Sequence, residues 1–440
     1  MVFSIIQKSK LEGQNRLDAE YYEPNNLDKA KRLANAESIR LGDISYITDG
    51  EHGSPIFDSK SGIKYFSAQH VKDCYIDSEN VNNISKIIDE KNKRSRLQLG
   101  DILISTVGTI GFAGLVTEEC LPANIDRHVA RIHLKERLSP EFLVVFLNSS
   151  YGRFQSIRES TGNVQLNLFI NKINDILVPK KDNAAVSELM KLRIQEIKKS
   201  KSFYFDAEAL LLQELGLKDF KVDEELFFTA KLSDVKSANR IDPDYYLPKF
   251  DTLLSKLGKF NRLSYIAKRR SGEFKLVKDQ EYQYTEISDV SVGDGEVSSN
   301  GILGAQLPVN AKIQLNSGEL IISKVRPTRG AIAIIPDNWE ENHVVSGAFS
   351  VFDVESPSRE YLQVVLRSII GKLQMERPTT GTSYPTITDN DIENLLIPIL
   401  PKPAQEKIAN LVNQSHRSRK KAKDLLKQAK QQVEELIEKG

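Results

Sequence analysis

The pattern of apolar and polar positions predicts short strands and medium helices in two stretches of the chain. Apolar runs bounded by glycine or proline predict strands at ILIS (102–105), FAGLV (112–116), VARIHL (129–134), ELIIS (319–323), AIAII (331–335) and AFSVF (348–352). Longer apolar segments predict helices at EFLVVFLNSS (141–150) and EYLQVVLRSI (360–369). Each stretch therefore mixes strands with helices.

A different pattern follows each stretch, after Pro179 and again after Pro401. Both segments lack internal proline and glycine for about 30 residues, a length typical of a long helix. The apolar positions are Met190, Ile197, Tyr204 and Leu211 in the first segment, and Ile408, Leu411, Ala422, Leu425, Ala429, Val433 and Leu436 in the second. Spacing close to seven residues favours two long helices that pack on each other, antiparallel if the repeats obey a pseudo-two-fold axis. The alternative is that each helix lies on its own domain.

The chain is also an internal duplication. The segment from Phe3 aligns without a gap with the segment from Phe227, and both contain an Arg-x-Asp-x-x-Tyr-Tyr-x-Pro pattern. GDILISTVGTIG (100–111) then matches GELIISKVRPTRG (318–330), and STGNVQLNLFINKINDILVP (160–179) matches TTGTSYPTITDNDIENLLIP (379–398). The repeat unit of about 220 residues is too long for a solenoid, so each unit is expected to be a domain with an appended helix.

Composition excludes several classes of protein. With 440 residues, more than one domain is expected. The 40% hydrophobic and 28% charged residues are typical of a globular protein, and the start has no signal-peptide pattern, so we expect a cytoplasmic protein without a membrane segment. Two cysteines exclude a disulfide scaffold and a cysteine-rich metal site. Lys and Arg number 61 against 60 Asp and Glu, which argues against a polybasic nucleic-acid coat.

The sequence contains no recognisable catalytic pattern. A phosphate-binding GxxxxGK[ST] loop, HExxH, GxSxG and CxxC are all absent. The six histidines do not recur at matching places in the two repeats, although a duplicated enzyme is expected to show its catalytic groups in both copies or in one clear context. We therefore expect a binding protein, with no catalytic residue and no metal site.

The duplicated motifs resemble those of type I restriction–modification specificity subunits. The resemblance rests on RLDAEYYEP and RIDPDYYLP, on the GDILISTVGTIG block, and on a TG…I…L…P ending before each long helix, and it extends over 16–215 and 240–436. In the second copy Pro403, Gln405 and Ile408 resemble the family's entry into its conserved helix, whereas NAAVSELMKL in the first copy departs from that pattern.

The resemblance implies an α+β fold: a tandem duplication of a mixed α/β target-recognition domain, each followed by a long helix, with the two helices paired as an antiparallel coiled coil. We place the first recognition domain at 1–183, the first spacer helix at 184–216, a linker and the second recognition domain at 217–400, and the second spacer helix at 401–440. A helix of about 30 residues spans about 45 Å, or about 13 base pairs of DNA, which predicts a gapped target.

The same resemblance implies the function of a non-catalytic subunit that binds a bipartite double-stranded DNA target. Its implied partners are two methyltransferase (modification) subunits and a restriction/translocase subunit. S-adenosylmethionine, ATP and Mg are expected on those partners, and no cofactor on this chain. Two alternatives remain open: the specificity chain of a type IIB-like restriction–methylation enzyme, and a duplicated protein-interaction scaffold that does not bind DNA.

Base reading requires polar side chains on loops that differ between the repeats. The candidates in the first repeat are His52, Ser67, Gln69, His70, Lys72, Thr106, Thr109, Arg158, Asn163 and Gln165. The candidates in the second are Lys268, Arg269, Arg270, Lys324, Arg326, Arg329, Arg377, Thr382 and Tyr384. The tyrosine pairs 21–22 and 245–246 are assigned to folding, because an aromatic pair before a proline suits the docking of a helix.

Overall fold

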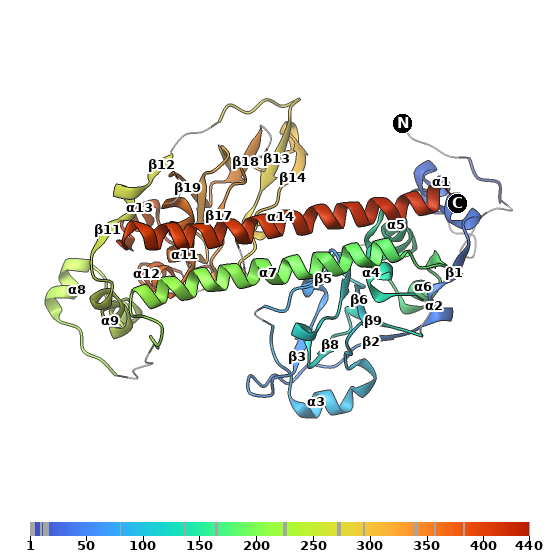
Figure 1. Cartoon of the computed structure of the whole chain (residues 1–440), viewed down its shortest axis with the longest axis horizontal. Helices are drawn as coiled ribbons and strands as arrows, with labels where there is room; N and C mark the ends of the chain where they lie inside the picture. The colour runs from blue at the N-terminus through green and yellow to red at the C-terminus, as the bar shows by residue number, and fades with distance from the viewer. Residues whose placement is uncertain are drawn as a thin grey trace. The chain divides into compact units, whose positions relative to one another are not determined.

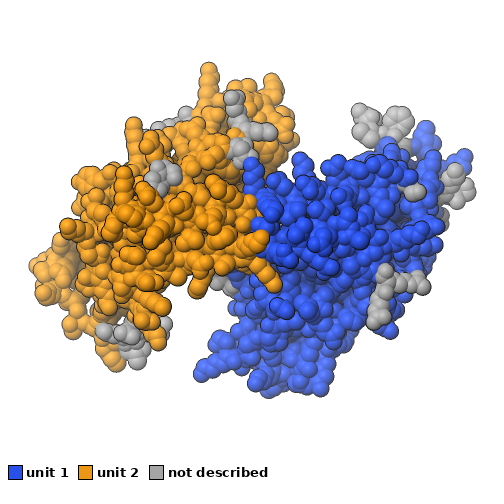
Figure 2. Space-filling model, in the orientation of Figure 1, with its two compact units in different colours: residues 1–197, 420–440 blue, residues 198–419 orange. Residues whose placement is uncertain are grey.

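A computed structural model of the chain describes all residues except 1–4, 9–10, 12–16, 80, 136–137, 163–165, 223–226, 271–273, 294, 338, 340–341, 356–357, 382 and 440. The chain divides into two compact units, which Figure 2 colours separately. Unit 1 comprises residues 1–197 and 420–440, and unit 2 comprises residues 198–419. The predicted domain boundaries lie at the ends of the long helices, whereas the units divide within those helices.

Unit 1 is built from short strands and helices in an α+β arrangement (Figure 1). Its strands are β1 (Ser38–Arg40), β2 (Ser45–Asp49), β3 (Lys64–Phe66), β4 (Val71–Lys72), β5 (Tyr75–Ile76), β6 (Ile102–Ser105), β7 (Ala113–Leu115), β8 (Ala123–Ile125), β9 (Val129–Leu134) and β10 (Leu177–Pro179). Its helices before the first long helix are α1 (Pro24–Asn35), α2 (Leu41–Ile44), α3 (Lys86–Lys91), α4 (Pro140–Asn148), α5 (Ser150–Glu159) and α6 (Ile170–Asn174).

Unit 2 repeats this arrangement with different loops. Its strands are β11 (Phe260–Arg262), β12 (Lys268–Arg270), β13 (Glu281–Thr285), β14 (Asn300–Leu303), β15 (Ala311–Gln314), β16 (Leu320–Ser323), β17 (Ile332–Ile334), β18 (His343–Ser346), β19 (Phe349–Asp353) and β20 (Leu396–Pro398). Its shorter helices are α8 (Leu232–Ala238), α9 (Pro248–Lys256), α10 (Leu263–Ile266), α11 (Ser358–Arg367), α12 (Ile369–Glu376) and α13 (Asp389–Glu393).

The sheet topology confirms the internal duplication. A four-stranded antiparallel sheet has the order β2-β9-β6-β7 in unit 1 and β12-β19-β16-β17 in unit 2. A two-stranded antiparallel ladder joins β1 to β10 and, equivalently, β11 to β20. A parallel pair, β3 with β8, corresponds to β13 with β18, to which unit 2 adds β14 and β15. The predicted strands and the predicted helices α4 and α11 are all confirmed.

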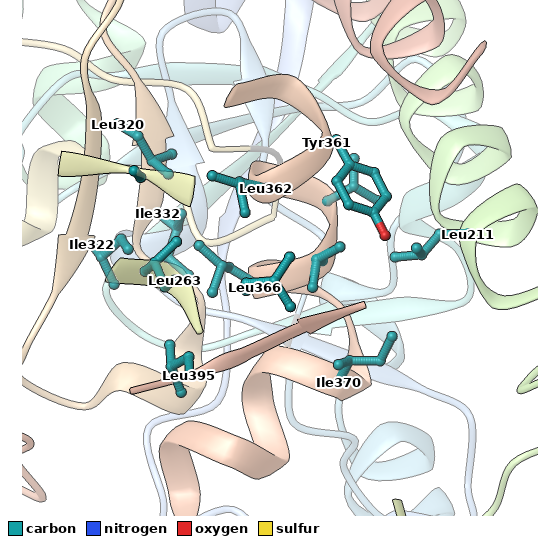
Figure 3. Close-up of a cluster of buried hydrophobic side chains, with 14 of the residues drawn as sticks. Leu211, Leu263, Leu320, Ile322, Ile332, Tyr361, Leu362, Leu366, Ile370 and Leu395 are labelled. Atoms are coloured by element: carbon teal, nitrogen blue, oxygen red, sulfur yellow. The ribbon is translucent and has the colours of Figure 1, made fainter. Parts of the chain in front are cut away.

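One central strand of each four-stranded sheet, β6 in unit 1 and β16 in unit 2, is buried on both faces, which explains why it is apolar at every position but the last. In unit 2, Leu320 and Ile322 of β16 point into the same core as Leu362 and Leu366 of α11 (Figure 3). Ile321 between them belongs to a second core, because successive strand residues point to opposite faces. In unit 1, β6 has the same alternation.

The two long helices are α7 (Ala184–Glu214) and α14 (Lys402–Lys439), and they pack antiparallel within each unit. In unit 1, Val186 and Met190 share a core with Val433, and Lys421 Nζ lies 3.0 Å from Glu196 Oε1. In unit 2, α7 from Tyr204 to Leu211 shares a core with Ile408 and Val412 of α14, and the hydroxyls of Ser200 and Ser415 are 2.9 Å apart. The predicted antiparallel pairing of the helices is therefore confirmed.

The buried stripe of each helix differs in part from the predicted one. Leu411 is only partly buried and Leu436 is exposed, whereas their neighbours Val412 and Ile437 are buried. A helix with 3.6 residues per turn drifts relative to a strict seven-residue repeat, which shifts the buried face by one position. In α7, Ile197 is half-buried, and the polar residues Arg193, Glu196 and Ser200 take the buried positions around it. No helix within the described ranges combines the length and apolarity needed to cross a membrane.

Candidate nucleic-acid interface

In each unit the structure brings two polar loops of the repeat together. In unit 1 the loop after β6 and the loop of residues 160–168 are joined by bridges from Asn167 to Val107 and to Thr161. In unit 2 the loop after β16 and the loop of residues 379–387 are joined by the equivalent bridges from Thr386 to Val325 and to Thr380. These two pairs of loops, which we call the loop pairs, share one backbone scaffold.

The main-chain hydrogen bonds of the two loop pairs are also equivalent. Leu168 N donates to Thr106 O at 2.9 Å in unit 1, and Ile387 N donates to Lys324 O at 3.0 Å in unit 2. Because the same bonds form around different side chains, the repeat fixes the loop backbones independently of the residues at their tips. That arrangement suits a surface whose side chains vary while its scaffold does not.

Among the described residues of the loop pairs, the two units differ at one turn. Gly108 has a φ of +73°, and its repeat counterpart Arg326 adopts a similar left-handed conformation with φ +48° and ψ +51°. Glycine adopts this region freely, but for a residue with a Cβ it costs about 1–2 kcal/mol. A Cβ at Gly108 would meet no atom within 4 Å. The turn is therefore open enough to carry a side chain in either repeat, and unit 2 carries an arginine there.

Arg326 stacks on an aromatic side chain of the facing loop. Its guanidinium carbon lies 4.5 Å from the centroid of the Tyr384 ring, and its Nη2 donates to Ser383 O at 3.3 Å. Tyr384 is 67% exposed, and Arg329 at the end of the short 3-10 helix Pro327–Arg329 is exposed as well. Both loops of unit 2 thus contribute side chains to one exposed polar cluster.

The loop tip of unit 2 is held from beneath by a buried arginine that is not among the candidates predicted from the sequence. Arg367 at the end of α11 is 6% exposed, and its Nη1 donates to Gly330 O at 2.8 Å. The repeat counterpart in α4, Asn148, exchanges hydrogen bonds with the backbone of Ala113 at the start of β7. A polar residue at the last position of the equivalent helix in both repeats, directly after an apolar run, was the signal that could have revealed this support.

Two of the candidate arginines have equivalent internal contacts in the two units. Arg158 Nε donates to Tyr21 O at 2.9 Å, and its guanidinium lies 3.8 Å from the Tyr21 ring centroid. Arg377 Nε donates to Tyr245 O at 3.2 Å, and its guanidinium lies 4.9 Å from that ring centroid. These contacts support the assignment of the tyrosine pairs to folding, and they occupy both arginines within their units.

A charge network also occupies other candidates of unit 2. Lys324 Nζ lies 3.1 Å from Asp389 Oδ1, and Arg269 Nε donates to Glu393 at 2.6 Å. Burial opposes ionisation of Asp389, but hydrogen bonds from Ser350 and Lys324 outweigh it, so the pKa of Asp389 lies below its usual value. Arg270 pairs with Glu319, which is 3% exposed. Of the basic run 268–270, Lys268 is the exposed member.

The remaining candidates of unit 1 lie on the loop pair and on two further loops. His52 Nε2 is 2.5 Å from Asp49 Oδ2, while Gln69 and Lys72 are exposed around a short 3-10 helix, Ala68–His70. Thr106 is buried and Thr109 is exposed. Asn163, Gln165 and Thr382 fall outside the residues that the structure describes. The candidate base contacts as a set stay predictions.

His70 is a candidate whose ring caps its own helix. Its Nδ1 accepts a hydrogen bond from Ser67 N at 2.9 Å, which requires that nitrogen to be unprotonated. Burial lowers the pKa of His70, although the carboxylate of Asp77 opposes the shift. The imidazole is therefore kept neutral by the fold, and its role in unit 1 includes holding the turn before β4.

We predict that this histidine makes unit 1 sensitive to acid. The folded-state pKa of His70 is lowered, so the unfolded chain binds the proton first. The contribution to stability is fully present above about pH 6.5 and is lost as pH falls through that value towards the folded-state pKa. The protection factors of amides in peptides covering 65–76, which allow for the slower intrinsic exchange in acid, should fall below about pH 6.5 in the wild type.

The variant His70→Asn tests the assignment, because its amide oxygen can accept the Ser67 bond without titrating. Its exchange should lack this acid-dependent component, whereas His52→Asn, which removes an exposed histidine of the same unit, should retain it. An unchanged pH profile in His70→Asn would contradict the prediction.

The fold and the loop pairs define a class: a duplicated α+β protein whose two units present differing polar tips on one shared scaffold. Over 123 residues the chain is 32% identical to the type I restriction enzyme EcoBI specificity subunit of Escherichia coli. The match covers 28% of this chain and 26% of that relative. The resemblance to type I specificity subunits is thereby confirmed, over about a quarter of the relative's length.

Other comparisons give broader but weaker likenesses. The S subunit of a type I restriction–modification system from M. genitalium aligns with a TM-score of 0.39 at 12% identity, over 91% of this chain and 95% of that one. The HsdS subunit from Thermoanaerobacter tengcongensis aligns with a TM-score of 0.28 at 14% identity, over 91% and 95%. No protein-family model matches the chain. The resemblance therefore rests on the sequence match.

Proposed function

We propose that this chain is the DNA sequence-specificity subunit of a type I restriction–modification complex. Each unit binds one half of a bipartite, gapped double-stranded target. The chain recruits two methyltransferase subunits and a restriction/translocase subunit. It carries no catalytic site and no cofactor of its own, and S-adenosylmethionine, ATP and Mg act on the partner subunits. Its target is host and invading DNA, so it works in the cytoplasm.

One observation carries this proposal: the two units keep one backbone scaffold and change the side chains at its tip. Gly108 of unit 1 corresponds to Arg326 of unit 2, on loops whose main-chain hydrogen bonds are equivalent. Gln165 corresponds to Tyr384 in the aligned sequence. An asymmetric bipartite target requires two readers that share a fold and differ in the side chains offered to base edges.

The near-neutral charge of the chain fits a reader that shares its phosphate contacts. A protein that binds DNA alone gains most of its affinity from lysine and arginine contacts to phosphates. Here the formal net charge is +1, and Lys324, Arg269 and Arg270 are paired with carboxylates inside unit 2. The proposal therefore assigns much of the affinity to the assembled complex and the choice of sequence to this chain.

Methylation-aware sequencing of host DNA tests the proposal. With the chain and its modification subunit present, we expect one bipartite, gapped adenine motif at nearly every occurrence. Deleting the chain should abolish methylation of that motif, and returning it on a plasmid should restore it. Exchange of residues 1–183 for those of a related subunit should then change one half-site and leave the other intact.

The opposite outcome is equally informative. If methylation is unchanged after deletion while the modification subunit is demonstrably expressed, the chain does not supply DNA specificity, and the interaction-scaffold alternative takes its place.

A further inference from the structure

The backbone of Arg326 is strained, because this turn holds an arginine in the left-handed region that glycine adopts freely. Its repeat counterpart is Gly108, which adopts the same left-handed region without strain. A non-glycine residue held in that region by its surroundings is a signature of a functional position. Hydrophobic burial does not offset this strain, because Arg326 is only half-buried on an exposed turn. Folding alone therefore does not explain the arginine.

The surroundings fix the direction of the Arg326 side chain. Its main-chain N donates to Pro385 O at 2.7 Å, which joins the turn to the facing loop. The Tyr384 ring supports one face of the guanidinium at 4.5 Å, and one nitrogen donates to Ser383 O. Arg367 holds the far end of the turn through Gly330 O. The Arg326 guanidinium, held by Tyr384 and Ser383 of the facing loop on a turn that is itself anchored, has lost much of its conformational freedom before any ligand binds.

Arg326 differs from the neighbouring basic residues in its ion pairs. Lys324 pairs with Asp389, and Arg269 pairs with Glu393. Among the residues that the structure describes, neither Arg326 nor Arg329 forms an ion pair. Of these two, Arg329 is exposed on the 3-10 helix, whereas Arg326 is stacked and oriented. The two arginines therefore suit different ligands.

Guanine is the base that matches an oriented guanidinium. Its O6 and N7 in the major groove are two acceptors spaced for the two parallel donors of arginine, and this bidentate pair is the commonest specific contact between protein and DNA. A phosphate contact needs charge but little orientation, and the freely exposed Arg329 suffices for it. A guanidinium held in one orientation by Tyr384 can distinguish one base from the other three.

We propose that Arg326, stacked on Tyr384, reads a guanine within the half-site bound by unit 2. The inference rests on the proposed function, because it names the base that one loop pair of a DNA-specificity subunit selects. Arg329, three residues away on the same turn, contacts the phosphate backbone. Gly108 leaves the equivalent place in unit 1 without such a reader.

The test uses the complex of the full chain with its modification subunits. Equilibrium binding is measured to the wild-type target and to every single base-pair change of the half-site assigned to unit 2. The variant Arg326→Gly restores the residue of the first repeat and relieves the backbone strain, so its thermal unfolding temperature should be no lower than that of the wild type. Its preference for one G·C pair should fall by about 5- to 150-fold, to near indifference at that pair.

Arg329→Ala is the matched control, since it removes the same charge from the same turn. It should weaken binding to all sequences by a similar factor and leave the profile of base preferences unchanged, with a shallower salt dependence. Sequencing of methylated adenines in cells should agree, with Arg326→Gly relaxing the motif at one guanine only.

Two outcomes would overturn the inference while leaving the proposed function standing. They are a wild-type half-site for unit 2 that lacks guanine, and an Arg326→Gly profile that keeps every base preference at uniformly lower affinity. If instead the wild-type complex shows no bipartite motif at all, the proposed function itself fails.

Discussion

Replacing Asp101 with alanine is expected to destabilise unit 1 by about 3–5 kcal/mol, because the change leaves buried donors without their acceptor. Asp101 is 1% exposed, and its carboxylate accepts from Arg131 Nε at 2.5 Å, from His133 Nδ1 at 2.7 Å and from Gln98 N at 2.7 Å. Arg131 is itself largely buried, with its side chain 12% exposed. Its charge would lose its counterion and could regain little hydration.

Hydrogen exchange measures this effect within one chain, since a protein of two units need not unfold in a single step. Amides of β6 and β9 should exchange much faster in Asp101→Ala, whereas β16 and β19 of unit 2 serve as an internal reference. The double variant Asp101→Leu with Arg131→Leu should recover much of the protection, because apolar replacement of both partners of a buried pair is often neutral. Equal protection in Asp101→Ala and wild type would show that the pair contributes nothing.

The same carboxylate position shows how the two repeats diverge beneath a shared fold. Glu319 corresponds to Asp101, and Asn316 N donates to it at 2.7 Å as Gln98 N does to Asp101. The arginine partner comes from a different strand, however: Arg131 lies on β9 in unit 1, and Arg270 lies on β12 in unit 2. A sequence alignment of the repeats pairs the carboxylates but cannot pair the arginines.

Local pattern was sufficient for the strands, the long helices and the duplication. A short apolar run such as ILIS predicts a strand that is buried on both faces. About 30 residues without glycine or proline, with apolar residues at helical spacing, predict a long helix. The middle of α7 was harder, because the polar residues Arg193, Glu196 and Ser200 are buried although none of them belongs to the predicted apolar stripe. Polar residues can be buried there because they pair with Ser415 and Lys421, which are more than 200 residues away in the sequence.

The candidate interface shows the opposite balance. Sequence divergence selected loops that the structure brings together in pairs. It could not separate arginines that stack on the tyrosine pairs, such as Arg158 and Arg377, from arginines at the exposed tip. That distinction depends on tertiary contacts 130 or more residues apart in the chain. The left-handed backbone of Arg326 was equally invisible, because only its match to Gly108 hints at it.

One glycine in each unit allows two consecutive buried helices to approach closely, and the sequence pattern did not predict this role. Gly371 lies near the start of α12 and corresponds to Gly152 in α5. A Cβ at residue 371 would lie 2.5 Å from the carbonyl carbon of Leu366 and closer still to its carbonyl oxygen, and a Cβ at residue 152 would lie 2.5 Å from Leu147 Cα. The preceding helix approaches so closely that only glycine fits.

Gly371→Ala is therefore expected to destabilise unit 2 by about 3 kcal/mol. Helix propensity alone predicts the opposite sign, a gain of about 1 kcal/mol for alanine over glycine. Overpacking dominates because the obstacle is backbone, which cannot rotate away as a side chain can. Faster hydrogen exchange in α11 and α12 would report the loss, and Lys372→Ala, an exposed change at the next position, should leave exchange nearly unchanged.

The same substitution should reach the proposed DNA reader. The 3-10 helix Pro327–Arg329 packs on α12, so moving α12 away from α11 displaces the turn that carries Arg326. We expect Gly371→Ala to reduce methylation by weakening recognition of the half-site bound by unit 2. Gly152→Ala should weaken recognition of the half-site bound by unit 1, because Ser156 of α5 abuts Gly111 of the equivalent loop. If either variant is less stable but methylates its motif with unchanged base preference, the helix junction does not affect base reading. The loops would then be supported only by Arg367 in unit 2 and Asn148 in unit 1.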